Sequence, residues 1–264
     1  MNKYWAMRQR DLLFSNELSL AEKELADQYL RCYEKTFNQI SVLYDELLAG
    51  QVGSRSEILV SDLYRFDRYF QLMNQLQINL QILGSKEITI GNERLTNIYK
   101  TTSELIRTEL GANKFSSLVD ENQVKTVLNA VWCPDGKIWS DRIWSNKALL
   151  QESVKNGLVD CIARGVSKDE LVKTLMKSFN TGFNYADRIA RTELNFIQNQ
   201  ATADRYREAG VEKYQILSAH DDRTCDSECA DKDGQIYLLK DMEVGVNYPP
   251  FHPNCRCAVL AVLD

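Results

Sequence analysis

Residues 19–50 read SLAEKELADQYLRCYEKTFNQISVLYDELLAG, and this stretch decides the class of the fold. Ser19 and Glu22 have the spacing of a capping box, in which each side chain bonds an unpaired backbone N–H, and Gly50 supplies the stop of the same helix. Between them, apolar residues recur at alternating steps of four and three, which keeps one seam facing a partner helix. This seam consists of Ala26, Leu30, Tyr33, Phe37, Ile40, Tyr44 and Leu47. We therefore predict a long helix that packs lengthwise against another.

The partner helix follows at once in the sequence. Its seam has the same period, stops before Gly84, and consists of Phe66, Tyr69, Met73, Leu76, Leu80 and Leu83. The short link at 50–56 is typical of an antiparallel helix hairpin.

The rest of the chain is predicted to be helical up to Gly210 and mixed after it. Asp120 precedes a short helix, Ser167 and Glu170 form a second capping box for a helix that ends before Gly182, and another helix covers 185–209. Short β-type runs follow at 213–219, 235–239 and 258–263. The sequence thus predicts an α+β fold, with predominantly long α-helices and a small C-terminal β-containing cap. The expected parts are an N-terminal helical hairpin region (1–112), a helical core (113–210) and a Cys/His-containing cap (211–264).

Composition places the chain among ordinary globular proteins. Its 264 residues are 44% hydrophobic and 26% charged, and no run approaches the roughly 20 apolar residues of a membrane span. Because the first residues are polar and charged, we expect no signal peptide and a cytosolic protein without membrane contact. Residues 211–264 carry 5 basic and 10 acidic side chains, whereas 1–210 are balanced. The cap is therefore a poor candidate for a nucleic-acid surface.

Four of the seven cysteines lie within 33 residues, in a C-x3-C pair and an H-x2-C-x-C group. The candidate metal ligands are Cys225, Cys229, His252, Cys255 and Cys257. Zinc takes four nitrogen or sulfur ligands in a tetrahedron, so five candidates serve four places. Thiols this close in a cytosolic chain favour Zn²⁺, while disulfides formed after release from the cell, or packed thiols, are the alternatives. The isolated Cys32, Cys133 and Cys161 are expected to be core residues.

Arg191, Thr192 and Glu193 lie in the last predicted long helix. Asp187 can pair with Arg191 one turn away. Glu193 has only apolar neighbours one turn away, so its carboxylate needs a partner across the fold. We interpret Glu193 as a structural link from this helix to the cap, with a catalytic acid or base as the alternative. His252, beside Cys255, is better read as a ligand or turn residue than as a general base.

Motifs of common enzymes are missing from the sequence. It contains no G-x-S-x-G, no Walker phosphate loop, no Gly-rich dinucleotide turn and no H-E-x-x-H. We therefore expect no catalytic residues, no organic cofactor and no small-molecule substrate.

The C-terminal half resembles the phage head morphogenesis proteins, also called Mu F-like minor head proteins. Four pieces carry the resemblance: 138–144 (IWSDRIW), 190–193 (ARTE), 221–234 (DDRTCDSECADKDG) and 249–257 (PPFHPNCRC). The resemblance covers roughly residues 130–264, and its last piece is the most specific. The family's characteristic residues here are Arg191, Thr192, Glu193, Asp221, Cys225, Cys229, His252, Pro253, Asn254, Cys255, Arg256 and Cys257.

The resemblance implies a low-copy structural protein of a phage head. Such a protein would associate with the portal and with coat or scaffolding proteins during procapsid assembly in the host cytoplasm, then remain in the virion head, with a contact to packaged DNA also implied. Arg191, Thr192, Glu193, Asp221, Asn254 and Arg256 would have architectural roles. Two other hypotheses stay open: a metal-dependent nuclease or transferase that uses Glu193 or His220, and a DNA-binding accessory protein.

Overall fold

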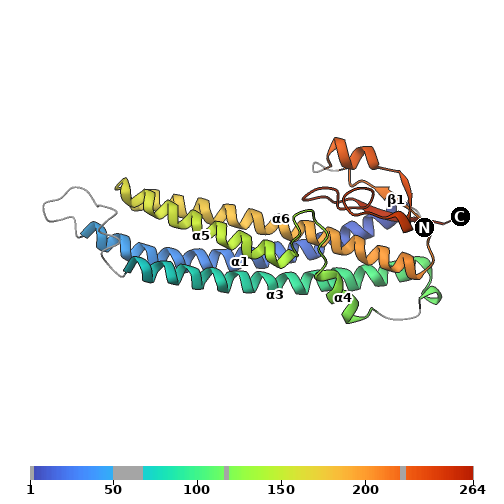
Figure 1. Ribbon diagram of the computed structural model, residues 1–264, viewed down its shortest axis with the longest axis horizontal. Helices are drawn as coiled ribbons and strands as arrows, with labels where there is room; N and C mark the ends of the chain where they lie inside the picture. The colour runs from blue at the N-terminus through green and yellow to red at the C-terminus, as the bar shows by residue number, and fades with distance from the viewer. Residues whose placement is uncertain (1–2, 50–67, 116–118, 221–223, 264) are drawn as a thin grey trace. The chain divides into compact units, whose positions relative to one another are not determined.

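The computed structural model describes residues 3–49, 68–115, 119–220 and 224–263. Its long helices are α1 (Lys3–Ala49), α3 (Arg68–Leu110), α5 (Trp139–Ala163) and α6 (Lys168–Glu208) (Figure 1). The 3₁₀ turn η2 (Ala112–Lys114) and the short helix α4 (Glu121–Leu128) lie between α3 and α5 in the chain. A small three-stranded antiparallel sheet follows α6, which confirms the predicted α+β class. Within these ranges, no helix combines the length and apolar character that a membrane span requires.

Packing divides the chain into two compact units, and every long helix contributes residues to both. Unit 1 comprises residues 1–22, 90–142 and 187–264, and unit 2 comprises 23–89 and 143–186. The division into 1–112, 113–210 and 211–264 stays a prediction.

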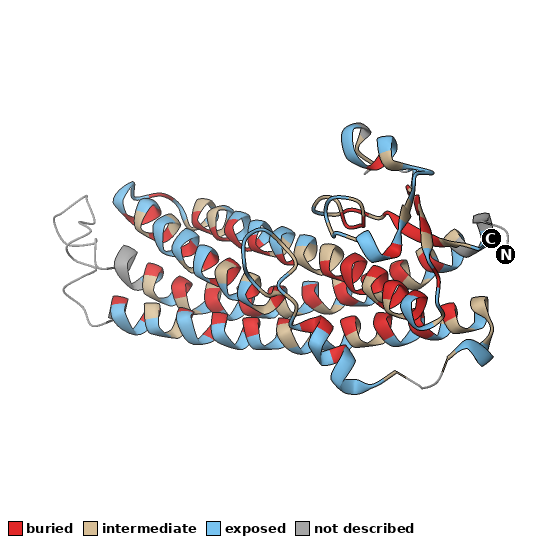
Figure 2. Ribbon diagram, turned by 45° about the vertical axis from the view of Figure 1, so that its right-hand side comes forward, coloured by how far each residue is buried: buried red, intermediate tan, exposed pale blue. Residues whose placement is uncertain are grey.

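Unit 2 is a bundle of four helix segments around one apolar core. Buried residues recur along each helix, where the ribbon of Figure 2 is red. The predicted seam of α3 is confirmed, since Tyr69, Leu76, Leu80 and Leu83 are all buried, while Phe66 and the link 50–56 lie outside the described residues.

The predicted seam of α1 is only partly correct. Ile40 and Tyr44 are fully buried, but Leu30 is 54% exposed and the neighbouring Tyr29 is buried instead. Tyr29 is buried in place of Leu30 because its ring packs edge-on against Phe183 and its hydroxyl donates to the Gly182 carbonyl at 3.0 Å.

Three predicted helix limits are wrong. Gly84 lies inside α3, which continues to Leu110, so the helix predicted to stop before this glycine does not stop there. Ser19 and Glu22 lie inside α1, because Phe14, Leu18 and Ala21 are buried and extend the apolar stripe toward the N-terminus. Gly182 lies inside α6 rather than after a helix, so the two helices expected at 168–181 and 185–209 are one. A Cβ at Gly182 would come within 3.1 Å of a Leu150 methyl, so this glycine permits close packing instead of stopping the helix.

Other helix starts agree with the sequence. Asp120 caps α4, accepting from the Asn122 N–H at 3.0 Å. Ser167 precedes α6 and accepts from the Glu170 N–H at 3.3 Å.

The sheet of unit 1 has the order β2-β1-β3, with β1 (Lys213–Leu217) between β2 (Ile236–Leu238) and β3 (Ala258–Val262). The strands are slightly shorter than the predicted runs. Tyr214 and Ile216 of β1 are fully buried and pack with Tyr206 of α6. The Tyr206 hydroxyl also accepts from the Ala261 N–H at 2.8 Å, which fastens α6 to the outer edge of β3.

Candidate functional site

The cysteines and the histidine predicted as metal ligands come together in unit 1. Cys225 is the N-cap of the π-helical turn η3 (Asp226–Ala230) and Cys229 lies within this turn. The other three candidates lie in the loop 252–257 that leads into β3. Cys225, Cys229 and His252 form one group of donor atoms within 4.8 Å of one another, and Cys229, Cys255 and Cys257 form a second. Cys229 belongs to both groups, so it is the centre of the cluster.

The two groups differ in exposure. Cys229, Cys255 and Cys257 are each 1% exposed, whereas Cys225 and His252 are partly exposed. The His252 Nδ1 lies 2.8 Å from the Pro253 carbonyl oxygen, and its Nε2 lies 2.9 Å from the Cys229 sulfur. A histidine whose Nδ1–H bonds a backbone carbonyl presents Nε2 as a ligand, which is the usual arrangement at metal sites.

The sulfur geometry fits zinc. Two thiolates on one tetrahedral Zn²⁺ with bonds of about 2.3 Å lie about 3.8 Å apart. The Cys229 and Cys255 sulfurs lie 3.9 Å apart, whereas a disulfide needs about 2 Å. The hydrogen bond with Cys255 and then burial raise the pKa of Cys229, so these thiols hold their protons unless a cation replaces them. The donor set can therefore bind a metal ion, and its chemistry matches zinc.

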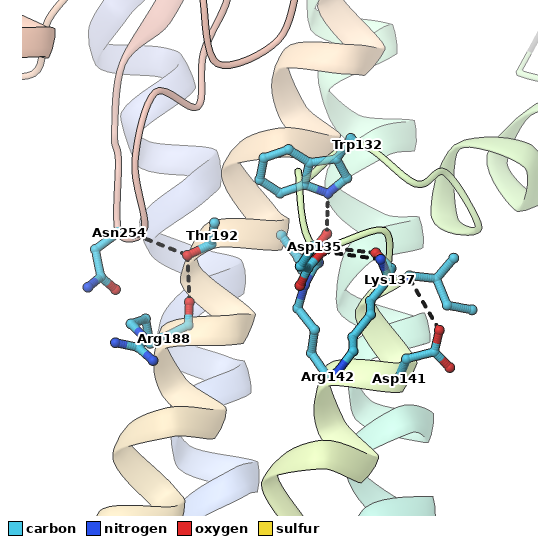
Figure 3. Close-up of polar contacts among 10 residues, drawn as sticks. Trp132, Asp135, Lys137, Asp141, Arg142, Arg188, Thr192 and Asn254 are labelled. Atoms are coloured by element: carbon cyan, nitrogen blue, oxygen red, sulfur yellow. Dashed lines mark hydrogen bonds and ion pairs between the residues drawn. The ribbon is translucent and has the colours of Figure 1, made fainter.

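Three consecutive residues of α6 fasten three different segments of unit 1. Arg191 bonds Asp187 at 2.8 Å, as predicted, and also pairs with Glu22 of α1. The Thr192 hydroxyl accepts from the Asn254 N–H at 3.1 Å, while it donates to the Arg188 carbonyl (Figure 3). These contacts attach α6 to α1 and to the loop 252–257.

Glu193 binds the segment that precedes α5 and the first turn of α5 itself. Its carboxylate accepts from the Trp132 Nε1–H at 3.1 Å and from Arg142 at 2.5 Å. Arg142 is also bonded through two nitrogens to Asp135, each at 2.9 Å, and Figure 3 shows these side chains converging. The Trp132 ring stacks on Phe196 with centroids 4.6 Å apart.

The predicted link from Glu193 to the cap is therefore wrong, because its partners lie at 132–142. Glu193 is 4% exposed, and burial raises its pKa to about 7 against the bonds from Trp132 and Arg142. Both oxygens are engaged, as expected of a structural carboxylate.

The remaining sequence candidates are placed as follows. Asn254 has a positive φ of 65°, a conformation that asparagine tolerates, and Arg256 pairs with Asp11 of α1. Asp221 lies outside the described residues. His220 belongs to neither metal-binding group; its Nε2 contacts Asp233 at 3.0 Å. Cys32 and Cys161 are buried as predicted, whereas Cys133 is only partly buried.

A hollow of about 650 Å³ lies elsewhere in unit 1 and contains none of these residues. Its lining consists of Arg207, Gly210, Val211, Glu212, Leu238, Leu239 and Lys240.

Sequence analysis missed the partners of the motif residues. Arg142 lies in the quoted motif 138–144, but neither it nor Trp132 was predicted as a partner of Glu193, although the lack of a partner in its own helix indicated a distant donor. Asn195 and Asn199 were also missed; both donate to the Cys257 carbonyl at 3.0 Å. A signal was available, since Thr192, Asn195 and Asn199 are spaced by three and four residues and so place polar side chains on one face of α6.

Residues 152–260 match the family model described as Phage Mu protein F like protein. This segment is similar to the Mu F-like family, and it makes up less than half of the chain. It includes Arg191, Thr192 and Glu193 and all five candidate metal ligands, whereas the predicted motif at 138–144 precedes it.

An uncharacterized protein of Haemophilus influenzae (strain ATCC 51907 / DSM 11121 / KW20 / Rd) is 29% identical over 113 residues. The match covers 43% of this chain and a quarter (25%) of that protein's length. No solved structure matches the chain significantly. The Mu F-like match thus rests on the segment that holds the candidate metal ligands and all of α6.

Proposed function

We propose that this protein is a non-enzymatic, low-copy minor head protein of a phage, which acts in procapsid assembly at the portal. The Mu F-like match of residues 152–260 supports a role in a phage head. The main observation in favour of a structural role is that Arg191, Thr192 and Glu193 each bond a different segment of unit 1. A catalytic Glu193 would need an open side facing a substrate, and this carboxylate is 4% exposed.

We further propose that one Zn²⁺ holds the cap together. Cys229, Cys255 and Cys257 would supply three ligands, and His252 or Cys225 the fourth. Zinc would replace thiol protons at the centre of the cluster and tie η3 to the loop 252–257. A segment of 54 residues has too small a core to be very stable alone, so a metal is a physically reasonable staple.

The proposed partners are the portal protein and coat or scaffolding proteins, met in the host cytoplasm before the protein enters the virion head. The exposed apolar side chains of α1 and α3 in unit 2 are the proposed contact, because Leu30 is 54%, Phe70 57% and Ile78 46% exposed. DNA contact inside the head is a further outcome to be tested.

The docking test uses point variants of the full chain, because α1 and α3 supply core residues to unit 2 and their removal would unfold it. Phe70→Ser with Ile78→Ser should abolish co-purification with the co-expressed portal protein. Leu149→Ser is the matched control, since Leu149 is 57% exposed on α5. Equal portal recovery with all variants would exclude this docking surface. Zinc-dependent cleavage of DNA by the wild type would overturn the non-enzymatic role.

A further inference from the structure

A polar stripe on α6 forms hydrogen bonds with the backbone of the loop 252–257, which carries three of the candidate metal ligands. Thr192, Asn195 and Asn199 are spaced by three and four residues, so they share one face of the helix. The Thr192 hydroxyl accepts from the Asn254 N–H at 3.1 Å. Asn195 and Asn199 each donate an amide N–H to the Cys257 carbonyl oxygen at 3.0 Å. The loop is thereby anchored on either side of Cys255.

Because the two amides are buried, any hydrogen bond that they fail to make would destabilise the fold. Asn195 is 1% exposed and Asn199 2%, and an unbonded amide at such a site is strongly unfavourable. Asn199 also donates to the Asn195 side-chain oxygen at 3.2 Å, and its own backbone carbonyl accepts from the Tyr248 hydroxyl at 2.7 Å. The two amides therefore have one rigid arrangement, which fixes the position of the Cys257 carbonyl.

The anchored part of the loop carries the buried half of the metal cluster. Cys255 and Cys257 lie at or between the anchored residues, and their sulfurs lie within 4.8 Å of the Cys229 sulfur. Cys225 and His252, on the other side of Cys229, are partly exposed. Among the described residues, the stripe donates hydrogen bonds to neither of them. The cluster thus has a fixed half and a more accessible half.

We propose that Thr192, Asn195 and Asn199 are positioning residues of the metal centre, which set the Cys255 and Cys257 thiols in place before a metal ion binds. This inference rests on the zinc site of the proposed function. Residues that orient metal ligands in this way contribute about 10- to 100-fold to metal affinity. The role assigns Thr192, a residue of the Mu F-like segment, to the metal centre rather than to helix packing alone.

The test measures zinc affinity by competition with a chromophoric chelator, using the full chain. Thr192→Val removes the acceptor for the Asn254 N–H at nearly constant volume, and Thr192→Ser restores it. Asn195→Leu with Asn199→Leu removes both donors to the Cys257 carbonyl; the pair is needed because each amide can serve alone. Asn79→Leu is the control, since Asn79 is an equally buried amide that bonds Thr36 and Gln39 in unit 2.

We expect about one zinc per wild-type chain, a 10- to 100-fold weaker affinity for Thr192→Val and the double variant, and wild-type affinity for Thr192→Ser and Asn79→Leu. Cobalt substituted for zinc should give an altered absorption spectrum in Thr192→Val, a change that a loss of packing elsewhere would not produce. Unchanged affinity and an unchanged cobalt spectrum in Thr192→Val, with zinc bound by the wild type, would overturn the positioning role alone. A wild type that binds no zinc would overturn the zinc site and this inference together.

Discussion

Glu193 provides a stability test whose sign is fixed by the structure. Its side chain is 4% exposed, and burial raises its pKa from 4.5 to about 7, although the bonds from Trp132 and Arg142 lower it. Glu193→Gln keeps the size of the side chain and one acceptor oxygen while it removes the charge. The variant therefore isolates the free energy of ionising this buried carboxyl.

The pH dependence follows from proton binding. Between pH 4.5 and about 7 the unfolded chain releases the Glu193 proton while the folded chain keeps it, so stability falls as pH rises through this window. At about 1.4 kcal/mol per tenfold change, the difference between the two pKa values corresponds to about 3 kcal/mol. The loss of unfolding free energy is complete above pH 7. It does not occur in Glu193→Gln, because glutamine does not ionise.

The assay is urea unfolding of both proteins at intervals from pH 5 to pH 8. The free energy of unfolding of Glu193→Gln minus that of the wild type should rise by about 3 kcal/mol as the pH rises across this range. Both histidines are common to the two proteins and cancel in the difference. Glu152→Gln, on an exposed position of α5, controls for the removal of one charge. If the wild type instead gains on the Gln variant as pH rises, the Arg142 ion pair outweighs burial and the reasoning is refuted.

Three further predictions concern the core and the cap. Lys147→Met should destabilise the protein by about 3–5 kcal/mol in urea unfolding, because it leaves the buried Glu87 unpaired, and adding Glu87→Leu should recover most of the loss; no recovery would contradict the pairing. Gly91→Ala should cost about 1–3 kcal/mol, because its Cβ would lie 2.5 Å from the buried Trp139 ring, and a variant as stable as the wild type would show that this ring can move. Chelation of zinc, or Cys255→Ser, should lower the melting temperature, whereas an unchanged value would argue against a structural metal.

The periodicity of the sequence was sufficient for the helical class and for the core of α3, but less so for helix limits. Gly182 looked like a stop because glycine is a poor helix former, yet tertiary packing against Leu150 favours it inside α6. The seam of α1 was misplaced by one residue because Leu30 and Tyr29 are both apolar enough for the core. The packing of the Tyr29 ring on Phe183 and its hydrogen bond to Gly182 favour Tyr29, and both are tertiary contacts.

The clustering of the five Cys and His candidates could be predicted because metal ligands must be particular residue types at close spacing, and that they bind a metal stays a prediction. Their supports could not be predicted. Asn195 and Asn199 contact backbone more than 50 residues away, and no local pattern predicts which carbonyl they bind. Trp132 and Arg142 meet Glu193 only because the chain returns to α6 after α4, so their roles depend on tertiary structure.

The central claim, a structural role in a phage head, is tested most directly by co-expressing the full chain with the portal and coat proteins of its phage and measuring its content in purified particles. A structural role in the head predicts a few copies of this chain per particle, and their number should depend on the presence of the portal protein. A chain that stays out of assembled particles, whether or not the portal is present, would contradict it.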